Sequence, residues 1–114
     1  MHEALFDDRA LKDTGVTTLD IAKAMIDEGF HPMTMYFPLV VHGAMLVEPT
    51  ETESKASLDQ FIAAVRSIAE RARAGDQALK AAPVHAPRRR LDETLAARKP
   101  VLTYRDSAPA QAAE

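Results

Sequence analysis

The chain has 114 residues, of which 46% are apolar, and a formal net charge of −3. This length provides one modest domain with one small core, and the absence of cysteine excludes disulfides and thiolate metal sites. No apolar run approaches the ~20 residues that a membrane-spanning helix needs, and the acidic N-terminus lacks the pattern of a signal peptide, so we expect a cytoplasmic protein with no membrane partner.

The charge is unevenly distributed. Residues 1–60 hold 4 Lys/Arg and 11 Asp/Glu, whereas residues 61–114 hold 10 and 6. A basic C-terminal segment on an acidic body can fold back on that body or bind an acidic partner. The run from Arg88 to Arg90 has no interleaved aromatic residues, and the whole chain is acidic. We therefore expect no binding to nucleic acid.

The N-terminal third predicts a weak strand and a helix. Residues His2 to Phe6 are partly apolar and can add a strand, and Asp7 to Asp13 form a polar connection. A helix over 18–28 is indicated because Thr17 can cap it and Gly29 can end it. Its apolar residues recur at helical spacing: Leu19, Ala22, Met25 and Ile26.

A β-hairpin follows in the sequence. Residues Met33 to Val41 are long, aromatic or β-branched, which favours a strand, although Pro38 removes a ladder donor and predicts that the strand ends or reaches an edge there. Gly43 supplies a turn, and Ala44 to Glu48 predict the returning antiparallel strand.

The strongest predicted element is a helix from Ser54 to Ala74, roughly 30 Å long, which Gly75 ends. Its apolar residues form one stripe at i, i+3, i+4 and i+7 spacing: Leu58, Phe61, Ile62, Val65, Ile68, Ala69 and Ala72.

The remainder predicts a tail. Short helices are indicated at Gln77 to Ala81 and Leu91 to Arg98, with an extended, proline-containing segment between them. We expect a small domain over 1–80, an extended docking tail over 81–104, and disorder over 105–114. The predicted fold class is α+β, with a small antiparallel sheet of two or three strands packed by two helices and an extended Pro/Arg-rich C-terminal tail.

No catalytic or metal site can be recognised from residue types and spacing. The four histidines lie at positions 2, 31, 42 and 85 without metal-ligand spacing, and the four glycines stand singly, so no phosphate-binding loop is predicted. No nucleophile–base pair is evident, and no lysine has the buried, strand-flanking setting that lowers a lysine pKa.

Two segments nevertheless resemble a family signature: Gly29-Phe-His-Pro-Met-Thr-Met-Tyr-Phe-Pro38 and Glu48-Pro-Thr-Glu-Thr-Glu-Ser-Lys55. They are similar to the C-terminal domain of the glycine cleavage system P-protein, the pyridoxal-phosphate-dependent glycine dehydrogenase (decarboxylating), and in particular to the second subunit of its two-chain bacterial form. The resemblance runs from Met1 to about Tyr104, through 19–23, 89–93 and 97–102.

The resemblance implies the small C-terminal domain of a fold-type I pyridoxal-phosphate enzyme. In that family glycine condenses with the cofactor and loses carbon dioxide, and the aminomethyl group passes to a lipoyl carrier, the H-protein. The cofactor's lysine lies in a large domain that would precede Met1, so we expect no catalytic residue in this chain and no activity without its partners. Those partners would be the large pyridoxal-phosphate-binding domain, the other P-protein subunit and the H-protein.

The same resemblance makes four residues candidates for lining the catalytic cleft: His31, Tyr36, Glu48 and Thr50. Each has a structural alternative. His31 can hydrogen-bond its own loop, and Tyr36 can belong to the core. For Phe37 the apolar neighbours favour the core. Glu48 and Thr50 can cap the following helix. The alternative for the whole chain is a non-catalytic interaction module or a decayed fragment.

Overall fold

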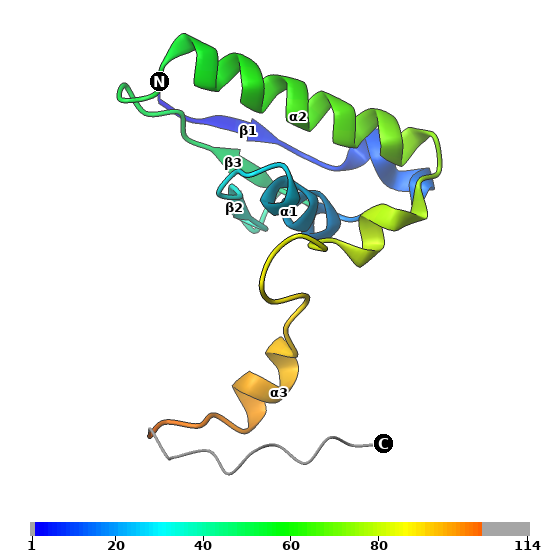
Figure 1. Cartoon of the computed structure of the whole chain (residues 1–114), viewed down its shortest axis with the longest axis vertical. Helices are drawn as coiled ribbons and strands as arrows, with labels where there is room; N and C mark the ends of the chain where they lie inside the picture. The colour runs from blue at the N-terminus through cyan, green and yellow to red at the C-terminus, as the bar shows by residue number, and fades with distance from the viewer. Residues whose placement is uncertain (1, 104–114) are drawn as a thin grey trace.

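A computed structural model describes residues 2–103, so the predicted disorder over 105–114 lies outside the described residues. Figure 1 shows a small sheet beside two helices and a C-terminal segment that projects from this body. The elements in chain order are β1 (Ala4–Phe6), the 3-10 helix η1 (Arg9–Thr14), α1 (Thr18–Asp27), β2 (Thr34–Met35), β3 (Met45–Val47), α2 (Lys55–Arg73), the 3-10 helix η2 (Gln77–Ala81) and α3 (Glu93–Arg98).

The predicted α+β class is confirmed. The three strands form an antiparallel sheet in the order β1-β3-β2. Ala4 pairs with Val47 on one side of β3, and Thr34 pairs with Leu46 on the other. The strand predicted in the first six residues and the predicted hairpin are both present, with β3 at the centre of the sheet.

Both long helices begin where the sequence predicts, because each has a side chain that satisfies a free backbone N–H. Thr17 and Asp20 form a capping box at α1, in which the Asp20 carboxylate accepts the Thr17 N–H at 2.8 Å. At α2 the Ser54 hydroxyl accepts the Ser57 N–H at 3.1 Å.

The strand predicted over Met33 to Val41 is wrong beyond Met35. Tyr36 has a φ of 61°, which turns the backbone out of the ladder. The Val41 N–H then donates to the Pro38 carbonyl at 3.0 Å, so this stretch is a turn-containing loop. The β-branched and aromatic residues after Met35 are typical of a strand, but the backbone turn at Tyr36 prevents them from continuing the ladder.

This loop closes at Gly43, where glycine is required. Gly43 has a φ of 61°, and a Cβ there would lie 2.1 Å from the Asp8 carboxyl carbon. Its carbonyl accepts the buried Thr18 hydroxyl at 2.8 Å. The start of α1 is thereby attached to the loop that leads into β3.

The core lies where α1, α2, η1 and η2 meet beside β3. Met25 and Ile68 are fully buried, and Leu79 is 1% exposed. Most of the connection predicted over Asp7 to Asp13 belongs to η1, which ends at Thr14 and places Leu11 in this core. The predicted apolar stripe of α2 is only partly buried, because Ile62 is 47% exposed. A three-stranded sheet is too small to cover a stripe of that width.

None of the helices within residues 2–103 combines the length and the apolar character that a membrane crossing requires.

Replacement of Ile68 by alanine is expected to lower the free energy of unfolding by about 2–5 kcal/mol, because a fully buried side chain leaves a cavity. The matched variant Ile62→Ala, on the same helix, is expected to lower the free energy of unfolding by about 1 kcal/mol or less. Denaturant unfolding of both variants measures the difference, and equal losses would contradict the core described here.

Candidate functional site

The main candidate site is an open cavity of about 430 Å³ between the loop before β2, the end of β3 and the start of α2. We call it the β3–α2 cavity. It is lined by Phe30, His31, Pro32, Met33, Thr34, Leu46, Val47, Glu48, Pro49, Thr50, Glu53, Ser57, Leu58 and Phe61. One wall is aromatic, since the Phe30 and Phe61 rings meet edge to face with centroids 5.6 Å apart.

Three of the four predicted candidates meet in this cavity: His31, Glu48 and Thr50. All three are exposed. The His31 Nδ1 lies 3.0 Å from the Pro32 carbonyl oxygen, and the Thr50 hydroxyl lies 2.7 Å from that of Thr52. The alternative that Glu48 and Thr50 cap the following helix is wrong, because Ser54 caps α2. The carboxylate of Glu48 therefore stays available to the cavity.

Tyr36 lies elsewhere, on the loop that follows β2. It is 45% exposed, and its N–H donates to the Ala44 carbonyl at 2.8 Å. Its neighbour Phe37 is 56% exposed, so the prediction that Phe37 belongs to the core is wrong, and the core alternative for Tyr36 is wrong as well. The turn at Tyr36 that ends the strand also carries both rings away from the core.

The residues that line the β3–α2 cavity include two carboxylates, one imidazole and three hydroxyl groups, with no lysine or arginine. A phosphate group needs cationic or clustered N–H donors, so these residues do not fit a phosphate-bearing cofactor by themselves. None of the five lysines is buried: Lys12, Lys23, Lys55, Lys80 and Lys99. Within residues 2–103 no group of acidic and histidine side chains is placed to hold a metal ion.

A second cavity, of about 410 Å³, lies between β1, η1 and α2 and is mainly apolar. The exposed Phe6 and Ile62 line it, with Arg66 and Arg73 among the few polar residues there. It offers contact area but no combination of groups for acid–base chemistry.

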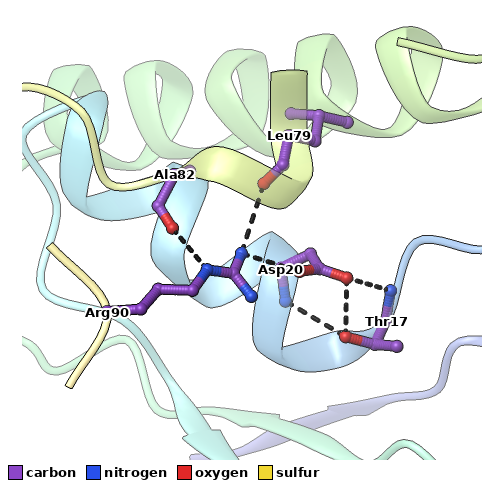
Figure 2. A network of polar contacts seen from close by, with 5 residues as sticks. All are labelled: Thr17, Asp20, Leu79, Ala82 and Arg90. Carbon is purple, nitrogen blue, oxygen red and sulfur yellow. Dashed lines mark hydrogen bonds and ion pairs between the residues drawn. The ribbon is translucent and has the colours of Figure 1, made fainter. Parts of the chain in front are cut away.

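The structure also contains a polar network that fixes the tail to α1 (Figure 2). The Arg90 guanidinium donates to Asp20 Oδ1 at 2.7 Å and to the Ala82 carbonyl at 2.8 Å. It also approaches the Leu79 carbonyl oxygen at 3.4 Å. Asp20 is only 5% exposed, so this ion pair is largely shielded from water on its acidic side.

A second carboxylate of α1 holds the same tail. Asp27 accepts the Val84 N–H at 2.8 Å and the His85 N–H at 2.8 Å. We call the Asp20 and Asp27 contacts together the tail clasp. Sequence reasoning missed it, because the two partners of each contact are 57 to 70 residues apart. The available signal was the basic segment on an acidic body, which predicts folding back without identifying partners.

The contacts of the clasp shift two acid pKa values. Burial opposes ionisation of Asp20, yet hydrogen bonds from the Thr17 backbone and hydroxyl and from Arg90 hold its pKa below the ordinary value. At Asp27 desolvation is likewise outweighed by the N–H groups of His85 and Val84, which lower the pKa. Both carboxylates are therefore ionised at neutral pH and bind the tail as anions.

Because the folded-state pKa of Asp20 is lowered, its stabilisation is present above the unfolded-state pKa and is lost as the pH falls through the folded-state pKa. The stability difference between the wild-type chain and Asp20→Asn is expected to be largest at about pH 7 and to shrink below about pH 4. Denaturant unfolding across that range measures it. A difference independent of pH would show that the ionised carboxylate does not stabilise the fold.

Comparison with known proteins identifies the family. A family model described as "Glycine dehydrogenase, C-terminal domain" matches residues 1–87. A "Probable glycine dehydrogenase (decarboxylating) subunit 2" of Caulobacter vibrioides is 73% identical over 111 residues, which are 96% of this chain and 21% of the relative. Proteins described in the same words from Shouchella clausii and Caldanaerobacter subterraneus are 52% and 51% identical over 90% and 91% of this chain.

The chain spans about a fifth of the length of these relatives. The region matched by the family model includes the cavity and the clasp up to His85, and the match to the Caulobacter protein continues through Arg90. The chain belongs to the glycine dehydrogenase C-terminal domain family.

Proposed function

We propose that this chain acts as the C-terminal part of a pyridoxal-phosphate-dependent glycine dehydrogenase (decarboxylating). In this proposal residues 1–80 form the small domain and residues 81–104 form its docking tail. The family match and the 73% identity to a subunit 2 support the assignment. The cofactor and its lysine belong to residues outside this chain, which by itself is inactive. In the complete enzyme the aminomethyl group that remains after glycine decarboxylation passes to a lipoyl carrier protein.

The observation that carries this proposal is the composition of the β3–α2 cavity. It gathers His31, Glu48 and Thr50 on an open surface but contains no lysine or arginine. Such a surface suits one wall of a cleft whose cationic, cofactor-binding side comes from another domain. The proposed role of the three residues is to close and orient that cleft. Tyr36 is proposed to line the cleft from the loop that follows β2, outside the cavity.

The proposal predicts functional complementation. The chain is mixed with the part of the Caulobacter relative that it does not match, together with the partner subunit and pyridoxal phosphate. Exchange of carbon dioxide with the carboxyl group of glycine is expected only when the chain is present. A stable, cooperatively folded chain that neither binds the large part nor restores exchange would contradict the proposal and favour a non-catalytic interaction module.

Within the reconstituted enzyme, His31→Ala and Glu48→Gln are expected to lower the exchange rate at least about tenfold, since each removes a polar group from the cleft wall. Both residues are exposed, so the melting temperature of the isolated chain is expected to stay within a few degrees. Glu51→Gln is the matched control, because Glu51 is exposed and does not line the cavity. Equal rates in all three variants would exclude the cavity as the cleft wall.

A further inference from the structure

The C-terminal residues of the described chain form an apolar segment that the body leaves exposed. We call residues 91–103 the arm. Its large apolar side chains are all exposed: Leu91 by 64%, Leu95 by 52%, Val101 by 85% and Leu102 by 86%. Helix α3 buries none of its residues, and Figure 1 shows it projecting from the body. Apolar side chains gathered on one short segment indicate an interaction surface.

The tail clasp sets the direction in which the arm leaves the body. Arg90, which pairs with Asp20, immediately precedes Leu91. Upstream, Asp27 holds the N–H groups of Val84 and His85. The chain is therefore fixed at two points just before the arm begins. A segment held in this way loses less conformational entropy on binding than a free tail does.

The charge of the arm and of the residues before it indicates the chemistry of its partner. Arg88, Arg89, Arg98 and Lys99 are exposed, and Asp92 and Glu93 are the acidic residues among them. Asp92 is already used to cap α3, since it accepts the Leu95 N–H at 2.8 Å. Within the arm itself the two basic and two acidic residues balance, but residues 88–103 together hold five basic and two acidic residues, with the basic ones towards the two ends. A segment with this net positive charge and with exposed apolar side chains between its basic ends fits an apolar groove with acidic residues at its rim.

The lengths of the relatives indicate where that groove lies. About four fifths of each relative is outside the region matched by this chain. The family model stops at residue 87, but the 111-residue match to the Caulobacter protein includes the arm. The arm therefore occurs in chains that carry the remaining part of the enzyme, which supplies a partner surface for every copy of the arm.

We propose that the arm docks in an acid-rimmed apolar groove on the part of glycine dehydrogenase that lies outside the region matched by this chain. This inference rests on the proposed function and assigns a site of attachment to it. Leu91 and Leu95 insert into the groove, while Arg98 and Lys99 contact its rim. The clasp acts as the positioning element of the arm.

The test measures the affinity of the chain for the large part of the Caulobacter relative, assembled with its partner subunit, by titration with fluorescently labelled chain. The double variant Leu91→Ser/Leu95→Ser is expected to bind at least about tenfold more weakly, because two buried apolar side chains are lost. The control Ala96→Ser/Ala97→Ser changes the same helix without removing a large apolar group and is expected to bind normally. Thermal unfolding of the isolated chain is expected to be unaffected in both, since α3 buries no residue.

Two further variants, one that reverses charges of the arm and one that breaks the tail clasp, test the inference independently. Charge reversal in Arg98→Glu/Lys99→Glu is expected to weaken binding and to reduce its dependence on salt concentration. Arg90→Gln leaves the sequence of the arm unchanged but removes its contact with Asp20. It is expected to weaken binding, because the direction in which the arm leaves the body is no longer fixed.

Three outcomes separate this inference from the proposed function. If the wild-type chain binds and restores carbon dioxide exchange, but the leucine variant binds equally well, only the docking of the arm is overturned. If the wild-type chain does not bind at all, both proposals fail. If sedimentation shows that the isolated chain dimerises through Leu91 and Leu95 and the large part does not compete, the arm serves a second copy and the inference is overturned.

Discussion

The carboxylate of Asp20 is the group on which the organisation of this domain depends. One of its oxygens accepts hydrogen bonds from Thr17 and completes the start of α1, and the other accepts the Arg90 guanidinium. A buried carboxylate is costly unless its hydrogen-bonding capacity is used, and here each oxygen has partners. The same ion therefore fixes a helix in the body and the point at which the tail leaves it.

The small size of the core explains how the surface is distributed. With only three short strands, the sheet cannot cover the full apolar width of α2, and Ile62 and the edge strand residue Phe6 stay accessible. A domain that buries its own core but leaves grooves beside it is suited to being one part of a larger body. This agrees with a chain that spans about a fifth of its relatives.

Local sequence signals were sufficient to predict the helices, because a cap and an apolar periodicity involve residues that are close together in the chain. The cap at Thr17 and the 3.6-residue periodicity placed both long helices within a residue or two. The strand beyond Met35 was wrong because composition does not reveal a positive φ at Tyr36. For the site, the family resemblance named four candidates, of which three share a cavity and Tyr36 does not. The tail clasp depends on partners far apart in the chain, which no local pattern encodes.

The separation between Asp20 and Arg90 also has a consequence for the order of folding. A contact that closes a loop of 70 residues forms slowly compared with a helix or a hairpin. Closing such a loop costs chain entropy, and this cost falls once the intervening residues are folded. During synthesis α1, the sheet and α2 all leave the ribosome before Arg90 does. We therefore expect the tail to attach late in folding, so that the arm acquires its orientation on a body that has already formed.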